Sequence, residues 1–174
     1  MKYLKDYIRT IPDFPEEGIL FRDITPLIGD ERGLVLAVEE MEKFIAGYDF
    51  DKVVGPESRG FIFAPIIARD FCKGFVPVRK RGKLPYRTIG QQYNLDYGQQ
   101  QVLEIHEDAI RPGERILIVD DLIATGGTTD AIIKLVEKAG GIVYGVDVLM
   151  ELNYLHGREA IAPHRLWSAI QFDE

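Results

Sequence analysis

Residues 116–129 read ILIVDDLIATGGTT, and this stretch constrains the fold of the chain more than any other. Its aliphatic opening predicts a strand that is buried on both faces, as in a parallel sheet. Two aspartates end the apolar run where a buried charge is expensive, and a glycine- and threonine-rich loop follows. A segment with helical periodicity then begins. Strand, polar loop and helix in this order are typical of an open α/β sheet, in which ligands bind at the carboxyl ends of the strands.

The rest of the chain alternates between strand and helix patterns. Short apolar runs predict strands at 52–55, 75–80, 115–120, 142–150 and 166–172. Apolar residues at helical spacing predict helices at 3–11, 34–48, 59–74 and 128–141, and residues 89–106 alternate in the manner of a β-hairpin. We therefore expect an α/β fold in which residues 1–174 form a single domain, with a central, mostly parallel sheet flanked by helices.

Length and composition exclude several classes of protein. The 174 residues suffice for one domain, and 46% hydrophobic with 28% charged residues is ordinary for a globular protein. The apolar runs are too short to cross a bilayer, and residues 1–10 lack the apolar core of a signal peptide. A single cysteine, Cys72, rules out an internal disulfide and fits a reducing compartment, so we expect a cytoplasmic protein without a membrane partner. The net charge of −7 argues against nucleic acid as a partner.

The loop after the central strand has the features of a phosphate-binding loop. Gly126 and Gly127 let the backbone approach a ligand closely, while Thr125 and Thr128 add hydroxyl donors. The N-terminus of the following helix favours an anion. We call residues 124–128 the phosphate loop.

The acidic pair, Asp120 and Asp121, would repel a phosphate, so we expect it to face a neutral, hydroxylated group from a solvent-facing strand end. A ribose diol fits, because each carboxylate can accept a hydrogen bond from a sugar hydroxyl. The stretch therefore predicts a ribose 5-phosphate site. The simpler alternative, in which Asp121 or Thr128 only caps the helix, leaves two adjacent acidic residues unexplained.

A second feature is the basic loop, residues 78–85, which reads VRKRGKLP. It gathers four cations in an otherwise acidic chain: Arg79, Lys80, Arg81 and Lys83. Such a cluster can be an ordinary solvated loop. Beside a predicted phosphate site, it is also a source of positive charge for an anionic ligand.

The stretch 116–129 resembles the phosphoribosyl-pyrophosphate motif of the type I phosphoribosyltransferases, in which an aliphatic strand, an acidic pair and A-T-G-G-T follow one another. The resemblance continues along the chain in PDFPEEGILFRDITPL (12–27), GPESRGFIF (55–63), VPVRKRGKLP (76–85), YNLDYG (93–98), LEIHEDAI (103–110) and GREAIAP (157–163). Within the family, FRDITPL and RKRGKLP are similar to the members that use adenine.

This resemblance implies a fold, a reaction and partners. The fold would carry an N-terminal hood within residues 1–33 and a β-hairpin lid at 88–106. The reaction would transfer the 5-phosphoribosyl group of phosphoribosyl pyrophosphate to adenine, giving AMP and pyrophosphate, in a homodimer. Mg²⁺ would arrive on the substrate, without direct protein ligands.

The resemblance also implies roles for individual residues. Ala124, Thr125, Gly126, Gly127 and Thr128 would hold the 5-phosphate, and Asp120 and Asp121 the ribose hydroxyls. The pyrophosphate ligands would be Ser58 and Arg59, together with Arg79, Lys80 and Lys83, which act partly across the dimer interface. The Glu57–Ser58 peptide bond would be cis.

The base would lie in the hood. Leu20 and Leu152 would sandwich the adenine ring, and the backbone from Leu20 through Phe21 to Arg22 would read its edge. The family commonly has Glu where this chain has Asp96, the residue implied to handle a proton near the purine. The hairpin is also one residue longer than the family's usual spacing before LEIH.

Three other functions remain open at this stage. A phosphoribosyltransferase for another base would keep 116–129 and change the hood, and FRDITPL argues against it. A non-catalytic regulator of the same fold, such as a purine repressor, would need a basic DNA-binding segment. A structural or interaction protein of flavodoxin-like architecture would not need the basic loop.

Overall fold

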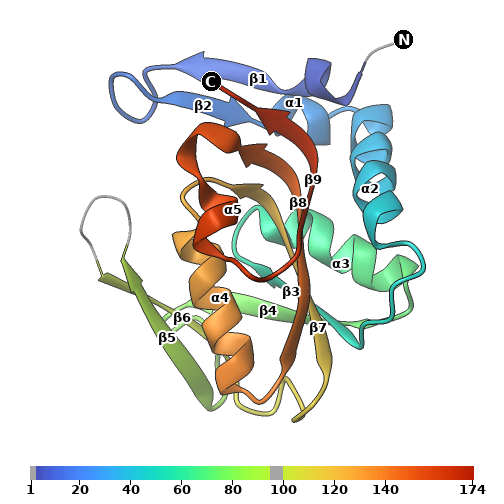
Figure 1. Cartoon of the computed structure of the whole chain (residues 1–174), viewed down its shortest axis with the longest axis vertical. Coiled ribbons are helices and arrows are strands. Elements are labelled where there is room, and N and C mark those ends of the chain that lie inside the picture. Colours follow the sequence, from blue (N-terminus) through green and yellow to red (C-terminus); the bar gives the residue numbers. More distant parts are fainter. Residues whose placement is uncertain (1–2, 95–99) are drawn as a thin grey trace.

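A seven-stranded sheet in the order β5-β6-β4-β3-β7-β8-β9 lies at the centre of the molecule (Figure 1). The computed structural model describes residues 3–94 and 100–174. The parallel part consists of β3 (Lys52–Pro56), β4 (Gly74–Lys80), β7 (Arg115–Ile123), β8 (Ile142–Leu152) and β9 (Leu166–Phe172). The strands β5 (Thr88–Asn94) and β6 (Gln100–His106) form an antiparallel hairpin joined to β4. The predicted α/β fold with a mostly parallel sheet is confirmed.

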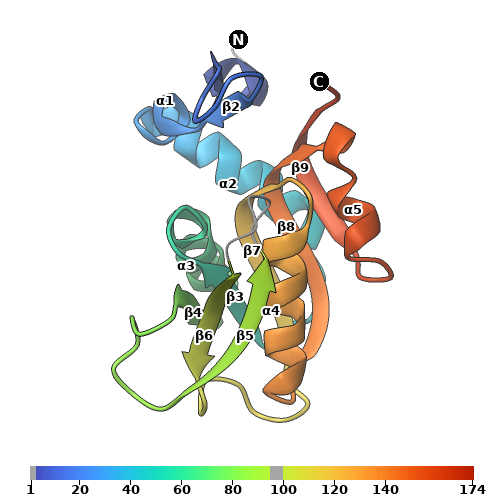
Figure 2. The same cartoon turned by 90° about the vertical axis from the view of Figure 1, so that its left-hand side faces the viewer.

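Helices cover both faces of the sheet (Figure 2). On one face α2 (Glu31–Ile45) and α3 (Gly60–Asp70) pack with Leu117 and Val119 of β7. On the other face α4 (Gly127–Lys138) packs with Ile116 and Ile118. Because successive side chains of a strand point to opposite faces, the aliphatic run of β7 contributes to two separate cores.

The helix expected at 3–11 is wrong beyond Tyr7. A short 3₁₀ helix, η1, spans Leu4–Tyr7, and β1 (Arg9–Pro12) then pairs antiparallel with β2 (Leu20–Asp23). Arg9 Nη2 lies 2.6 Å from Asp23 Oδ2, so the pairing is reinforced by an ion pair that helical periodicity could not reveal. The short helix α1 (Thr25–Ile28) follows, and this N-terminal region lies above the sheet in Figure 1.

Other boundaries differ by a few residues. The helix expected at 34–48 begins earlier, because the Asp30 side chain accepts hydrogen bonds from the N–H groups of Arg32 and Gly33. The helix expected at 59–74 ends at Asp70 and keeps Pro65 inside it. The sequence reading missed two short elements after β8, η2 (Asn153–Leu155) and α5 (Gly157–Ala160).

The strand expected to end at Asp120 continues to Ile123. Its extra length is held by β8, since Leu122 pairs with Met150 and Ile123 with Glu151. The two aspartates therefore lie inside β7, and alternation along the strand directs their side chains to opposite faces of the sheet.

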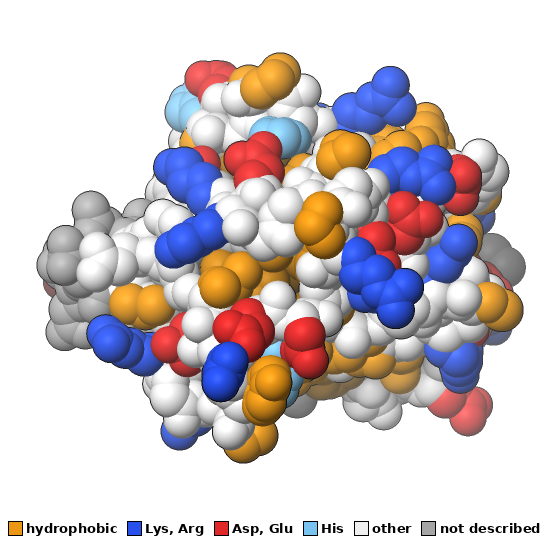
Figure 3. Space-filling view, turned by 90° about the horizontal axis from the view of Figure 1, so that it is seen from below, with side chains coloured by type: hydrophobic (Ala, Val, Ile, Leu, Met, Phe, Trp, Pro, Cys, Tyr) orange, Lys and Arg blue, Asp and Glu red, His pale blue; other side chains and the backbone are white. Residues whose placement is uncertain are grey.

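The surface carries charges of both signs. On the face shown in Figure 3, Lys and Arg side chains are interspersed with Asp and Glu, without a broad area of one charge. Within residues 3–94 and 100–174, no helix has the length and apolar character needed to cross a bilayer.

Candidate active site

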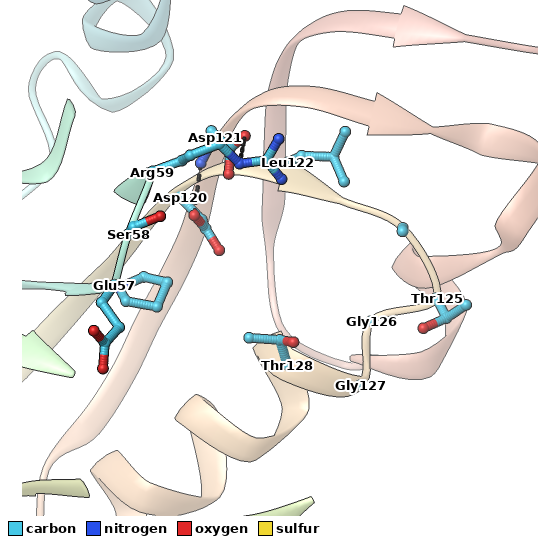
Figure 4. Close-up of a pocket in the computed structure, with 12 residues that line it drawn as sticks. Glu57, Ser58, Arg59, Asp120, Asp121, Leu122, Thr125, Gly126, Gly127 and Thr128 are labelled. Carbon is cyan, nitrogen blue, oxygen red and sulfur yellow. Dashed lines mark hydrogen bonds and ion pairs between the residues drawn. The ribbon is translucent and has the colours of Figure 1, made fainter. Parts of the chain in front are cut away.

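A cavity of about 230 Å³ opens where β3, β7 and the phosphate loop meet (Figure 4). It is lined by Pro56, Glu57, Ser58, Arg59, Asp120, Asp121, Leu122, Ala124, Thr125, Gly126, Gly127 and Thr128. The structure therefore brings together the acidic pair, the phosphate loop and the Ser58–Arg59 turn, which come from separate parts of the sequence. They meet at the carboxyl ends of parallel strands, the edge at which such sheets bind ligands.

The phosphate loop needs its first glycine. Gly126 has φ +86°, a backbone conformation that residues with a side chain rarely adopt, and α4 begins at the next residue. The loop thus leads directly into the N-terminus of a twelve-residue helix, whose unpaired N–H groups suit an anion. The Tyr93 side chain of β5 lies close to Thr128, which brings the hairpin next to the loop.

The acidic pair is less exposed than expected. Asp121 is only 3% exposed, and its Oδ2 lies 3.0 Å from Arg59 Nε, so its expected place at a solvent-facing strand end is wrong. Asp120 points into the space between Ser58 and the phosphate loop, where its Oδ1 accepts a hydrogen bond of 2.8 Å from the Asp121 N–H (Figure 4).

Burial shifts the titration of both carboxyls. It raises the pKa of Asp120 well above its usual range, and the neighbouring Asp121 charge raises that pKa further. Burial also raises the pKa of Asp121, while the Arg59 guanidinium partly offsets the shift. The pair therefore holds protons more tightly than free carboxyls do, and hydroxyl or cationic ligands favour its ionised form.

The turn before α3 has the expected cis peptide bond between Glu57 and Ser58, so that prediction is confirmed. The Glu57 carboxylate accepts a hydrogen bond of 2.5 Å from the Lys80 N–H and lies 3.2 Å from Arg79 Nη2. Gly60 lets α3 start close to the acidic pair, because a Cβ there would lie 3.0 Å from Asp120 Oδ1.

The basic loop does not line this cavity. Arg79 turns toward Glu57 and also donates to the Lys83 carbonyl oxygen at 3.3 Å. The side chains of Lys80 and Lys83 are exposed. These three residues thus do not line the cavity with Ser58 and Arg59, with which the sequence grouped them as pyrophosphate ligands, although Arg79 and the Lys80 backbone contact Glu57 at its edge.

A second cavity of about 530 Å³ adjoins the first. Its lining is mainly apolar and contains all four residues predicted for the base: Leu20, Phe21, Arg22 and Leu152. Leu122, Ala124, Thr125 and Arg59 line both cavities, so the two are continuous.

The Arg22 side chain is held away from a base-reading role. Its guanidinium stacks 4.2 Å from the Phe172 ring centroid, Nη1 donates to Thr10 Oγ1 at 2.6 Å, and Nη2 donates to the Glu174 carbonyl oxygen. A contribution of Arg22 to base recognition is therefore left to its backbone, as the sequence reading expected.

Sequence reasoning missed some lining residues of the second cavity. Tyr154 and Leu155, which lie in η2 shortly after Leu152, also line this cavity. Their position directly after a buried parallel strand was the available signal, because ligands bind at that edge of the sheet. Asp96, proposed to handle a proton, lies outside the described residues, as does part of the hairpin stretch thought to be one residue longer.

A glycine-rich loop next to an acidic pair at the carboxyl end of a parallel strand is typical of proteins that bind phosphorylated sugars, and residues 28–154 match the model of the phosphoribosyl transferase domain family. Over 172 residues the chain is 50% identical to the adenine phosphoribosyltransferase of Lachnoclostridium phytofermentans, covering 99% of this chain and 98% of that one. It is 52% identical to the enzyme of Thermotoga neapolitana, covering 97% and 99%. The chain belongs to the adenine phosphoribosyltransferase family.

Solved structures agree with this membership. The adenine phosphoribosyltransferase of Thermoanaerobacter pseudethanolicus superposes with a TM-score of 0.94 at 47% identity, covering 97% of this chain and 98% of that one. The enzyme of Saccharomyces cerevisiae, crystallised with an imino-altritol bisphosphate and adenine, superposes with a TM-score of 0.89 at 36% identity, covering 95% and 96%.

Proposed function

We propose that this protein transfers the 5-phosphoribosyl group of phosphoribosyl pyrophosphate to adenine, yielding AMP and pyrophosphate. The observation that carries the proposal is the continuity of two cavities with different chemistry. One is polar and combines a phosphate loop with an acidic pair, and the other is mainly apolar and of a size for a purine. Family membership and the adenine bound by the yeast relative support adenine as the base.

The phosphate loop would bind the 5-phosphate through backbone N–H groups and the hydroxyls of Thr125 and Thr128. Asp120 and Asp121 would accept hydrogen bonds from the ribose hydroxyls. Held at both ends, the ribose presents its C1 atom toward the second cavity, and fixed orientation of this kind lowers the barrier to reaction.

In the reaction N9 of adenine forms a bond to ribose C1 while the bond from C1 to the pyrophosphate oxygen breaks. Positive charge develops on the ribose and negative charge on the leaving group. Ser58 and Arg59 would bind that pyrophosphate, and electrostatic stabilisation of this type commonly contributes more to catalysis than any other effect. Asp96 would accept the proton that leaves N9 as the bond forms.

The oxygen-rich lining of the first cavity suits a hard cation such as Mg²⁺. Asp120 and Asp121 would stand beside it, and most of its ligands would come from the ribose and pyrophosphate oxygens. When bound, Mg²⁺ neutralises part of the charge on the leaving group.

The adenine ring would lie between Leu20 and Leu152, with the backbone from Leu20 to Arg22 reading its edge. The basic loop, whose cations lie outside the cavity of their own chain, would lend Arg79, Lys80 and Lys83 to the neighbouring site of a homodimer. We place the enzyme in the cytoplasm, with neither nucleic acid nor membrane as a partner.

Pyrophosphate release with each purine base in turn tests the proposal. Adenine should be used, and hypoxanthine and guanine should be rejected, because a 6-oxo group cannot donate the hydrogen bond that a 6-amino group donates. An unpaired acceptor costs roughly 1–3 kcal/mol, or about 5- to 150-fold in kcat/KM. Comparable values of kcat/KM for adenine and hypoxanthine would contradict the assignment.

A further inference from the structure

The short helix α5 lies directly against the phosphate loop, backbone to backbone. A Cβ on Gly157 would lie 2.2 Å from the Ala124 carbonyl oxygen. A Cβ on Gly126 would lie 2.8 Å from the Gly157 carbonyl oxygen and 2.9 Å from Ala160 Cβ. No side chain could fit between the two segments at these points, so a displacement of α5 would displace the loop.

An ion pair between the buried carboxylate of Glu151 and the half-exposed guanidinium of Arg158 holds α5 in place. Glu151 of β8 is 4% exposed, and its Oε1 and Oε2 accept hydrogen bonds of 3.0 and 2.6 Å from Nε and Nη2 of Arg158. Ser168 of β9 donates to Oε2 at 2.7 Å, and Arg158 Nη1 donates to the Leu166 carbonyl oxygen at 2.8 Å. The pair thus fastens α5 to the two C-terminal strands.

The same glutamate stands next to the start of the loop. Glu151 is paired in register with Ile123, the last residue of β7 before the phosphate loop. Neither Glu151 nor Arg158 lines the two cavities described above. The Arg158 guanidinium is directed to Glu151 and Leu166, so the pair has no direct contact to offer a ligand in the site.

The chemistry of the pair suits a positioning role. A bidentate bond between a guanidinium and a carboxylate fixes orientation as well as distance. Glu151 is the buried partner, so losing the bidentate bond from Arg158 leaves a buried carboxylate poorly compensated, and losing the Glu151 charge frees the half-exposed guanidinium that orients α5. Either change lets the backbone of α5 move. The nearest backbone on one side of α5 is the phosphate loop.

We propose that Glu151 and Arg158 are positioning residues for the 5-phosphate, acting through Gly157 on the phosphate loop. The inference rests on the proposed function, because it takes the loop to be the 5-phosphate site. It gives residues 157–160 a role in binding the 5-phosphate, although these residues do not line the site.

The test measures, by calorimetric titration of the full chain, the Kd of ribose 5-phosphate and the Kd of pyrophosphate. Under the proposed function these two ligands occupy different parts of the first cavity. Glu151→Gln keeps the size of the side chain and removes its charge. It should raise the Kd of ribose 5-phosphate by about tenfold or more and change that of pyrophosphate by less than about twofold, since small misplacements of binding groups have large effects. Arg158→Lys should shift the same ligand in the same direction, because the ammonium cannot form the bidentate bond.

The matched control is Glu159→Gln. This residue lies on the same short helix, is 78% exposed and pairs only with His156 among the described residues. It should leave both Kd values within about twofold, as surface pairs contribute little.

Three outcomes would overturn the inference. The first is unchanged ribose 5-phosphate binding in a folded Glu151→Gln protein. The second is an equal loss of affinity for both ligands, which would indicate a general structural role. If Glu151→Gln does not fold, Arg158→Lys provides the same comparison. Failure of the wild-type protein to bind ribose 5-phosphate is the third, and it differs from the others because it also removes the site assignment under the proposed function.

Discussion

Asp120 and Asp121 are adjacent in the sequence but have different surroundings. Asp121 is buried against Arg59, whereas Asp120 points into the cavity and accepts a hydrogen bond from the backbone of its neighbour. Asp120 is therefore the more open of the two to a sugar hydroxyl, although Asp121 also lines the cavity. Asp121 is tied to the cation that we assign to the pyrophosphate, so it connects the two halves of the substrate.

Replacing both carboxylates tests the role of the acidic pair. The double variant Asp120→Asn, Asp121→Asn keeps the shape of both side chains and should lower kcat/KM by about 10- to 100-fold or more. A single hydrogen bond to a charged group corresponds to roughly 1.5–3 kcal/mol. Steady-state kinetics with adenine would measure the loss, and circular dichroism would verify the fold. Turnover near that of the wild type would rule out the assignment of the ribose hydroxyls.

A second prediction at the scale of single residues concerns the effect of Asp147 of β8 on stability. It is completely buried, and within the part of the chain that the structure describes neither carboxylate oxygen has a hydrogen-bond partner. Burial raises its pKa well above the usual range, and the nearby Glu42 charge adds to the shift. Burial, with the neighbouring Asp70 carboxylate that can accept a hydrogen bond from protonated Glu42, raises the pKa of Glu42 itself to about 7.

The sign of the pH dependence follows. Because both folded-state pKa values are raised, the native state binds more protons than the unfolded state, and the free energy of unfolding falls as pH rises. For Glu42 the fall occurs between about pH 4.5 and 7. Asp147→Val should therefore raise the free energy of unfolding at pH 8, by roughly 1–3 kcal/mol, and by much less near pH 4. Urea unfolding at both pH values measures this difference in the free energy of unfolding. An increase that is the same at both pH values would contradict the ionisation argument.

At the scale of elements, the hairpin and the phosphate loop are linked. The Tyr93 side chain of β5 lies close to Thr128, and its hydroxyl donates a hydrogen bond of 3.2 Å to Gln101 Oε1 of β6. β5 thus lies beside the loop that we assign to the 5-phosphate, and Gln101 connects β6 to it through Tyr93. An element in contact with a substrate loop is well placed to act as a lid.

Asp96, between those strands, is predicted to meet the purine only when the lid closes. Asp96→Ala should lower kcat by about 100-fold, the lower end of general acid–base contributions, and leave the affinity for phosphoribosyl pyrophosphate nearly intact. Asp96→Glu restores the acid common in the family and should retain activity. Separate measurement of kcat and of substrate binding distinguishes this role from simple anchoring of the turn. Unchanged turnover in Asp96→Ala would leave catalysis to positioning and charge neutralisation.

The elements differ in how far the sequence could predict them. The unit from β7 to α4 was accessible because its signals are local: an aliphatic run, glycines and a helical repeat. The pairing of β1 with β2 could not be predicted, since it depends on the contact between Arg9 and Asp23. The helix α5 could not be predicted either, because its four residues are too few to show a helical period. Tertiary pairing also extended β7 past Asp120, where the charges alone suggested an end.

The candidate site shows the same division. The phosphate loop could be predicted from the residues themselves, because glycine and threonine at a helix N-terminus have few other uses in that order. The burial of Asp121 could not, because its partner Arg59 is distant in the sequence. The support of the loop by Gly157 was equally hidden, as it depends on two backbones meeting in space.

At the scale of the whole molecule, the basic loop lies outside both cavities of its own chain described above. Arg79 is turned toward Glu57, and none of the three predicted cations lines either cavity described above. In a strongly acidic chain, a cluster of exposed cations next to an anion site is explained if a second copy places its own site against it. A closed dimer with two-fold symmetry would give each site one such loop.

Mixed dimers test whether the basic loop acts on a neighbour. One parent carries Arg79→Ala with Lys80→Ala, and the other carries Asp120→Asn with Asp121→Asn, so each should be nearly inactive alone. In a mixed dimer, the intact acidic pair of the first subunit receives the intact loop of the second, which restores one site of two. Random exchange of equal amounts makes half of the dimers mixed, so activity should recover to about a quarter of the wild-type value. Sedimentation would establish the dimer beforehand, and no recovery after verified exchange would mean that the loop acts within its own chain.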